Sequence, residues 1–240
     1  MRAHLVLIIL WLAIGSLAHA DDIPTEELQR ILAAGGAMLL DARPHLEYAI
    51  SHIPGAQDVA PKAGQPPATY VSDVAEVGRM VNRRKDAPLV IYGNGPFCSK
   101  SQRLADELIK DGFTAVRRYQ LGIPAWRALG GVTQIELDGA RYVMSGDRTA
   151  VWIDARPSGG KPTVPGARNI ERSRVEVGKD VGELKKAKED GRLPMNDHNT
   201  RIIVFGATVD DARFVAEQIA REAFHNVSFY AGSAAELAAR

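Results

Sequence analysis

One short sequence pattern occurs twice in this 240-residue chain, in the same order and at nearly the same spacing. The segment MLLDARP at 38–44 is followed 113 residues later by VWIDARP at 151–157. Three further pairs keep this order at offsets of 111 or 113 residues: 53–56 with 164–167, 89–93 with 202–206, and 112–116 with 223–227. The sequence therefore predicts two copies of one domain, each of about 100 to 115 residues, which is an ordinary domain size.

Within each copy, short apolar runs alternate with segments of helical periodicity. The runs predict buried strands at 37–40, 88–92, 151–153 and 201–205. Apolar residues at helical spacing predict helices at 101–111 and 210–223. A strand, a tight loop and a helix, repeated in this way, favour a mainly parallel sheet with helices on its faces. The predicted fold class is α/β, with two such domains.

The N-terminal residues 1–20 have the pattern of a secretory signal peptide. A short basic start is followed by an apolar run at 5–14 and by Ala-His-Ala at 18–20. The run is shorter than the roughly 20 residues needed to span a bilayer. We therefore expect cleavage near residue 20, a periplasmic or otherwise exported protein, and no stable membrane insertion afterwards. The remaining boundaries are predicted as a first domain at 21–137, a linker at 138–149 and a second domain at 150–240.

Composition argues against several classes of function. The formal net charge is +1 and aromatic residues make up 6% of the chain, which gives no indication of a nucleic-acid partner. His198 and His225 have no partner at metal-ligand spacing, so neither a metal site nor another cofactor is predicted. Cys98 is the single cysteine and cannot form an internal disulfide. Its two alternatives are an inert buried thiol and a reactive one.

Residues 40–56 of the first copy, LDARPHLEYAISHIPGA, form its longest recognisable motif. This segment resembles the rhodanese signature, and LGIPAW at 121–126 resembles the family's closing motif. The second copy keeps Asp154, Arg156 and Pro-Gly-Ala at 165–167, but lacks the acidic-aromatic pair, the histidine and the cysteine. The resemblance implies two rhodanese-like domains, an active first one and a diverged second one without catalytic activity.

The loop that contains Cys98 is suited to sulfur chemistry. A loop between a buried strand and a helix directs backbone N–H groups into a concavity, and the helix N-terminus adds partial positive charge. A thiolate held there has a lowered pKa and is nucleophilic near neutral pH. We therefore predict Cys98 as the catalytic residue. The predicted substrate-binding residues are Gly93, Asn94, Gly95, Ser99, Lys100 and Ser101. Ser99 or Ser101 is expected to cap the helix, and Lys100 to supply a cation.

Four residues of the signature are predicted to support the site rather than to react. Asp41 and Arg43 are expected to form an ion pair that holds the sheet edge and the loop, and Asp154 and Arg156 to do the same in the second copy. Glu47 and His52 are expected to form structural hydrogen bonds.

One departure from the family leaves alternatives open. The resemblance implies a catalytic cysteine directly after the strand, where this chain has Gly93, and the loop is longer than the common form. The first hypothesis is a sulfurtransferase that moves sulfane sulfur from thiosulfate or a protein persulfide through Cys98. The second is a catalytically inactive scaffold. Phosphate-ester chemistry is disfavoured, because four residues separate Cys98 from Arg103 where a phosphatase of this architecture has five.

Overall fold

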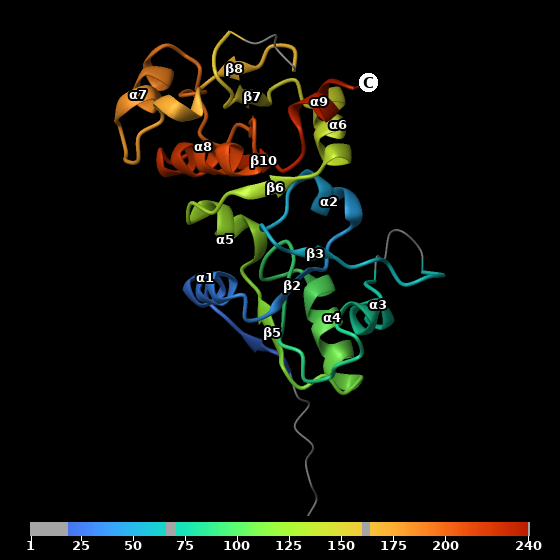
Figure 1. Cartoon of the computed structure of the whole chain (residues 1–240). Helices are drawn as coiled ribbons and strands as arrows, with labels where there is room; N and C mark the ends of the chain where they lie inside the picture. The colour runs from blue at the N-terminus through green and yellow to red at the C-terminus, as the bar shows by residue number, and fades with distance from the viewer. Residues whose placement is uncertain (1–18, 66–70, 160–163, 240) are drawn as a thin grey trace, which may run out of the picture.

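A computed structural model describes residues 19–65, 71–159 and 164–239 of the chain. The apolar run at 5–14 lies outside these ranges. No helix within them is long and apolar enough to cross a bilayer. The described residues form two α/β domains that follow one another along the molecule, as Figure 1 shows. The predicted fold class is confirmed.

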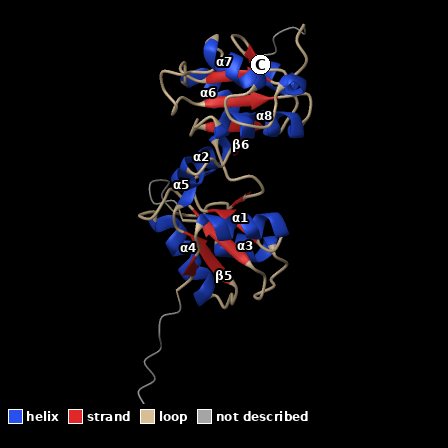
Figure 2. Ribbon diagram, turned by 90° about the vertical axis from the view of Figure 1, so that its left-hand side faces the viewer, coloured by secondary structure: helices blue, strands red, loops and turns tan. Residues whose placement is uncertain are grey.

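The first domain contains a five-stranded parallel sheet in the order β1-β5-β4-β2-β3. Its strands are β1 (Asp21–Asp22), β2 (Met38–Asp41), β3 (Gln57–Asp58), β4 (Leu89–Tyr92) and β5 (Val116–Tyr119). Its helices are α1 (Thr25–Ala34), α2 (His45–Ile50), α3 (Val74–Met80), α4 (Ser99–Lys110) and α5 (Gly122–Ala128). Figure 2 shows the helices on both sides of the strands.

Each face of this sheet has its own apolar core. One face packs against α3 and α4, for example through Val77 and Leu104, and the other packs against α1 and α5 through Leu28 and Trp126. Strand β4 is buried along its whole length because both of its faces are covered. This explains why the central strands are continuous apolar runs rather than alternating patterns.

The second domain repeats this architecture with the sheet order β6-β10-β9-β7-β8. Its strands are β6 (Thr133–Ile135), β7 (Val151–Asp154), β8 (Arg168–Asn169), β9 (Ile202–Phe205) and β10 (Val227–Tyr230). Its helices are α6 (Leu137–Gly146), the 3-10 turn η2 (Arg172–Arg174), α7 (Gly182–Glu189), α8 (Val209–Arg221) and α9 (Ala234–Ala238). The helices α7 and α8 cover one face, and α6 and α9 cover the other.

The segment between the copies differs from the predicted domain boundaries. Residues 133–135 were assigned to the first domain, but they form β6 at the edge of the second sheet. Residues 138–149 were predicted to be a linker, but most of them belong to α6, which buries Ala140 and Val143 in the second core. A three-residue edge strand carries almost no hydrophobic pattern of its own, so its partner is decided by tertiary contacts.

Helix α2 of the first domain packs directly on α6 of the second. Gly139 allows the close approach, because a Cβ at this position would lie 2.1 Å from the carbonyl oxygen of Ala49. His45 of α2 contacts Asp58 of β3 through Nδ1 at 2.6 Å and Asp138 of α6 through Nε2 at 2.9 Å. The two domains therefore share a polar and closely packed contact at α2.

Candidate functional site

Cys98 lies at the carboxyl ends of the parallel strands, in the loop 93–98 that connects β4 to α4. It is the residue directly before α4, with φ −75° and ψ 99°, and its own side chain makes no capping hydrogen bond. The thiol is half-buried. Open α/β sheets bind ligands at this edge, because the loops and helix N-termini converge there.

The sulfur of Cys98 is surrounded by hydrogen-bond donors. Burial raises the pKa of this thiol, but the nearby backbone N–H groups of Ser101, Asn94 and Lys100, together with the Ser101 hydroxyl, outweigh burial and lower the pKa below its ordinary value. These donors stabilise the thiolate and leave the thiol unchanged, which is why they shift the equilibrium toward the anion. We call this set of donors the sulfur cradle.

The space at Gly93 explains the late position of the cysteine. A Cβ built on Gly93 would lie only 2.6 Å from Sγ of Cys98 and 3.3 Å from its Cβ. The sulfur of Cys98 therefore occupies the volume that a side chain at position 93 would fill. The glycine at the start of the loop therefore leaves the space into which the cysteine at its end places its sulfur.

The start of α5 holds the loop from one side. Gly122 has φ +62°, and a Cβ there would lie 2.2 Å from the oxygen of Gly93 and 2.6 Å from the nitrogen of Gly95. The N–H of Ile123 donates to the same Gly93 oxygen at 3.1 Å. Within the loop, the N–H of Cys98 donates to the oxygen of Gly95 at 2.9 Å. Only glycine permits this close backbone approach at position 122.

Helix α2 holds the loop from the other side. The Asn94 side chain donates a hydrogen bond to the Glu47 carboxylate. Because the backbone N–H of Asn94 belongs to the sulfur cradle, Glu47 is connected to the sulfur through a single residue. A structural hydrogen bond is the expected role of Glu47, and the structure identifies Asn94 as the donor.

The ion pair of Asp41 and Arg43 lies beneath the site and is buried. Arg43 donates to Asp41 through Nε at 2.9 Å and Nη2 at 2.6 Å, and to the oxygen of Ser51 at 2.5 Å. The hydroxyl of Tyr92, at the end of β4, donates to Asp41 at 2.6 Å. The pair thus ties β2, β4 and the segment after α2 together at the sheet edge.

His52 contacts the second domain rather than the sulfur cradle. Its backbone N–H donates to the oxygen of Gln134 at 3.0 Å, and its Nδ1 lies 3.0 Å from the oxygen of Tyr48. The ring is buried and stacks on Tyr48. This residue fixes the path of the chain between α2 and β3.

Three of the predicted binding residues act differently from the expectation. Helix α4 begins at Ser99, and neither Ser99 nor Ser101 is its N-cap, because Cys98 occupies that position. Lys100 contributes its backbone N–H to the sulfur cradle. Ser99 is exposed. At this junction of loop and helix the donors near the sulfur are mainly backbone N–H groups, and their directions cannot be predicted from the residue types.

The family comparison agrees with this architecture in both halves. The model of the rhodanese-like domain matches residues 24–129 and 142–240. The chain belongs to the rhodanese-like family. The tandem arrangement predicted from the repeat is therefore confirmed.

Individual similar proteins match this rhodanese-like chain only in part. The HTH-type transcriptional regulator Rv0324 of Mycobacterium tuberculosis is 31% identical over 110 residues, which are 46% of this chain and 43% of the regulator. Among solved structures, EanB with a C412S substitution, in complex with hercynine, is 15% identical with a TM-score of 0.35. That match covers 90% of this chain and 59% of EanB. The Alr3790 protein from Anabaena sp. is 26% identical with a TM-score of 0.36, over 46% of this chain and 88% of its own.

The second rhodanese-like domain has a different loop at the equivalent place. Its loop 206–208 is shorter, contains no cysteine and leads directly into α8. The Thr208 side chain caps α8 by accepting a hydrogen bond from the N–H of Asp211 at 3.1 Å. Asp210 and Asp211 place negative charge in the first turn. This helix end is closed by its own side chains and disfavours an anion.

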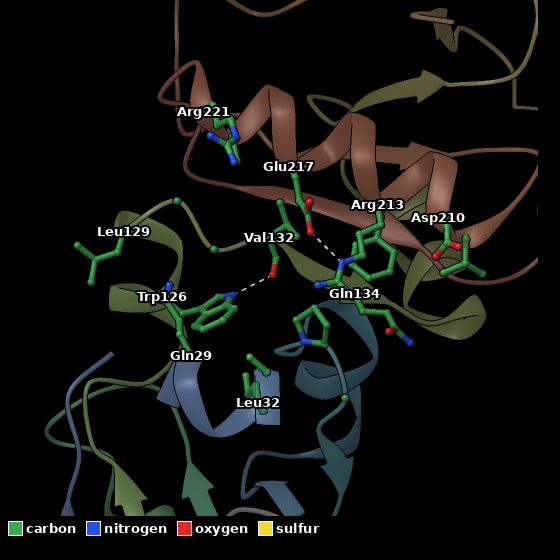
Figure 3. Close-up of a pocket in the computed structure, with 18 of the residues that line it drawn as sticks. Gln29, Leu32, Trp126, Leu129, Val132, Gln134, Asp210, Arg213, Glu217 and Arg221 are labelled. Atoms are coloured by element: carbon green, nitrogen blue, oxygen red, sulfur yellow. Dashed lines mark hydrogen bonds and ion pairs between the residues drawn. The ribbon is translucent and has the colours of Figure 1, made fainter. Parts of the chain in front are cut away.

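A cavity of about 1140 Å³ lies between the two rhodanese-like domains, and Cys98 is not among the residues that line it. Figure 3 shows Gln29 and Leu32 of α1 on one side of it and Arg213 and Glu217 of α8 on the other. Trp126 donates to the oxygen of Val132 at 2.8 Å, and Arg213 donates to Glu217 at 2.8 Å. These polar groups satisfy one another. Among the described residues, no group of three or more histidine, cysteine or acidic side chains could hold a metal ion.

Proposed function

We propose that this protein is a sulfurtransferase that carries sulfane sulfur on Cys98. The observation that supports the proposal most strongly is the sulfur cradle, in which three backbone N–H groups and a hydroxyl surround a thiol of lowered pKa. A thiolate is the reactive form of cysteine, and the donors that stabilise it also suit the negative charge of a persulfide or thiosulfate.

The proposed reaction has two steps. The Cys98 thiolate attacks the outer sulfur of thiosulfate, forms a new S–S bond and breaks the S–S bond of thiosulfate, so that sulfite leaves with the bonding electron pair. A thiophilic acceptor, such as cyanide or a thiolate, then attacks the outer sulfur of the Cys98 persulfide. The bond between the two sulfurs breaks, and the Cys98 thiolate is restored within the sulfur cradle. A protein persulfide replaces thiosulfate in the first step when the donor is a protein, and its thiolate is then the leaving group.

Gly93 has a defined part in this proposal. The volume next to its Cα is filled by the sulfur of Cys98, 2.6 Å from where a Cβ would lie. The late cysteine thus brings its sulfur to the place where an early side chain would begin. This compensates for the glycine that stands where the family resemblance implies a cysteine.

Intact-mass measurement tests the proposal. Purified protein is incubated with thiosulfate or a low-molecular-weight persulfide, and we expect wild type to gain the mass of one sulfur atom. The Cys98→Ala variant is expected to gain nothing, and cyanide is expected to remove the adduct and release thiocyanate. If wild type forms no adduct with either donor and releases no thiocyanate, the transferase is wrong and the scaffold hypothesis takes its place.

The compartment and partners belong to the same proposal. We propose an exported protein whose donor is a small sulfur-containing anion or a protein persulfide. The N-terminal pattern of a basic start, an apolar run and Ala-His-Ala supports export. N-terminal sequencing of the protein from its native host tests this, and a first residue near Asp21 is the expected result. An intact Met1 in the mature protein would contradict it.

A further inference from the structure

Phe97 is the most exposed large apolar side chain in the described part of the chain. It is 102% exposed, whereas the six others of this kind are between 40% and 69% exposed. It stands immediately before Cys98 in the loop between β4 and α4. Aromatic rings contribute large buried areas at protein interfaces, and their exposure to water is unfavourable. The ring beside the thiol is therefore a candidate contact for the molecule that exchanges sulfur with it.

A β-turn presents Phe97 to the outside. The N–H of Cys98 donates to the oxygen of Gly95 at 2.9 Å, so Pro96 and Phe97 are the two central residues of the turn. Proline suits the first of these positions because its ring fixes φ near the value that the turn requires. The helices α2 and α5 hold the start of this loop. The backbone thus places the ring at the tip of the turn and the thiol at its base.

Charged side chains around the sulfur offer little means of selecting a partner. Arg118 donates to Asp22 at 2.7 Å and is thereby neutralised. This hydrogen bond raises the pKa of Arg118, and the charges of nearby acids and of Cys98 add to the rise. Residues 93–102 contain one cation, Lys100, and no acidic residue. A single flexible ammonium attracts anions in general but does not distinguish one sulfur compound from another. Selection therefore depends on the apolar contact.

We propose that Phe97 is the specificity-determining residue for the sulfur acceptor, and that this acceptor is a protein segment with apolar side chains beside its cysteine. The inference rests on the transferase function proposed above and names the class of acceptor that it uses. A small anion cannot cover a ring that is exposed on all sides, whereas an apolar protein surface buries the ring as the two sulfurs meet. The acceptor thiolate then attacks the outer sulfur of the Cys98 persulfide, and the Cys98 thiolate leaves with the bonding electron pair.

Thiol–disulfide exchange with two model peptides tests the proposal. Both have the same length and charge and one cysteine, which is flanked by leucine and phenylalanine in one peptide and by glycine and serine in the other. Each is supplied as its mixed disulfide with thionitrobenzoate. The Cys98 thiolate attacks the peptide sulfur and forms a new S–S bond, and the coloured thionitrobenzoate leaves with the bonding electron pair. We expect wild type to react about tenfold faster with the apolar peptide, because the ring is buried on contact.

The ratio of the two rate constants separates recognition from a structural role. In Phe97→Ala the ratio is expected to fall close to one, and Phe97→Leu is expected to keep most of it because leucine is also apolar. A side chain that only supports the loop alters the thiolate, so that its removal slows both peptides by the same factor and leaves the ratio unchanged. That result overturns the proposal, as does a ratio of about one in wild type. Tyr142→Ala removes an exposed aromatic side chain from the second domain and is expected to keep the wild-type ratio.

Two further measurements separate this proposal from its alternatives. If a second copy of the chain covers Phe97 instead, wild type sediments as a dimer and Phe97→Ala as a monomer, which overturns the proposed acceptor. Sulfur uptake from thiosulfate, measured by intact mass, reports on the transferase alone. A chain that gains sulfur but shows no preference between the peptides retains the transferase and loses the role of Phe97. A chain that prefers the apolar peptide but never gains sulfur retains the contact at Phe97 and loses the transferase.

Discussion

The two domains share one fold but complete the N-terminus of the equivalent helix in opposite ways. In the first, the residue before α4 is Cys98, no acidic residue occupies the first turn, and N–H groups of the loop and helix face the sulfur. In the second, Thr208 caps α8, and Asp210 and Asp211 follow it. The exposed N–H groups of a helix start can bind either the protein's own side chains or an external anion. The same topology therefore gives a candidate site in one domain and a closed helix end in the other.

The last residues of the strands that precede these loops, β4 and β9, also differ between the domains. Tyr92 ends β4 and donates its hydroxyl to Asp41. The equivalent residue of the second domain is Phe205, which has no hydroxyl, although Asp154 and Arg156 still form their ion pair at 2.7 Å. The ion pair is common to both domains and is thus a property of the fold. In both domains the arginine also lies over the aromatic ring that ends the central strand, and it is the hydroxyl hydrogen bond from that ring to the aspartate that distinguishes the first domain.

The largest effect is expected when Gly93 receives a side chain. In Gly93→Ala the new Cβ would lie 2.6 Å from Sγ of Cys98, so the sulfur must leave the cradle. We expect the rate of alkylation by iodoacetamide near neutral pH to fall at least about tenfold, since the thiolate loses its donors. Gly206→Ala is the matched control, because its Cβ would meet backbone of α8, including the nitrogen of Ala212 at 2.9 Å. It is expected to lower stability and to leave the alkylation rate unchanged. Equal rates in wild type and Gly93→Ala would contradict the assigned position of the sulfur.

A smaller effect is expected when the first turn of α4 receives a negative charge like that in the first turn of α8. Lys100 and Asp210 are both the second residue of their helices. A carboxylate at position 100 opposes the thiolate, so Lys100→Asp is expected to raise the pKa of Cys98 by about one unit. The pH dependence of the alkylation rate measures this shift as a movement of the whole profile to higher pH. Lys110→Asp, at the far end of the same helix, is expected to leave the profile in place. A profile that does not move in Lys100→Asp would show that helix charge has no influence on the sulfur.

A still smaller effect is expected from the contact between α2 and the loop. Asn94→Ala removes the hydrogen bond to Glu47 but keeps the backbone N–H of residue 94. The loop becomes less well held, and we expect the alkylation rate to fall about two- to fivefold through a modest rise in the pKa of Cys98. Asn226→Ala, far from the loop in the second domain, serves as the control. An unchanged rate in Asn94→Ala would show that Glu47 has no positioning role for the sulfur cradle.

The weakest effect concerns the contact between the domains at His45. Hydrogen bonds to the carboxylates of Asp58 and then Asp138 raise the pKa of His45 above its ordinary value. The protonated form is thus favoured in the folded state, so its stabilising contribution is complete below about pH 6.5 and is lost as the pH rises through the raised pKa. The imidazole is 60% exposed, and solvent screening keeps the contribution below about 1 kcal/mol. Denaturant unfolding at several pH values is expected to show a slightly weaker decline toward high pH in His45→Gln than in wild type. Parallel curves would contradict the assignment.

Local patterns were sufficient for most of the architecture. The repeat predicted two copies, and the apolar runs predicted β2, β4, β7 and β9 because central parallel strands are buried on both faces. The order of strand, loop and helix placed Cys98 before a helix N-terminus without coordinates. These features depend on residues close together in the sequence.

The predicted domain boundary and linker were wrong, because contacts between residues distant in the sequence decide where these segments pack. The linker at 138–149 is mostly helix α6, and β6 pairs with β10, so that Thr133 and Ser228, with their hydroxyls 2.7 Å apart, lie side by side. The Asn94–Glu47 bond and the position of Gly122 against Gly93 were also not predicted. Each joins segments separated by many residues, and no periodicity encodes which partner is chosen.

The amino-acid sequence alone determined the duplication, the α/β class and the presence of a single cysteine next to a helix start. Tertiary structure alone decided where the sulfur atom lies, because its donors come from the loop and from α4, and α2 and α5 hold that loop in place. Hydrophobic periodicity arises because whole helices and strands are buried on one or both faces, so it can be recognised in a short stretch of sequence. The place of one atom depends on backbone directions and on the space left by Gly93, and only the packed fold fixes both.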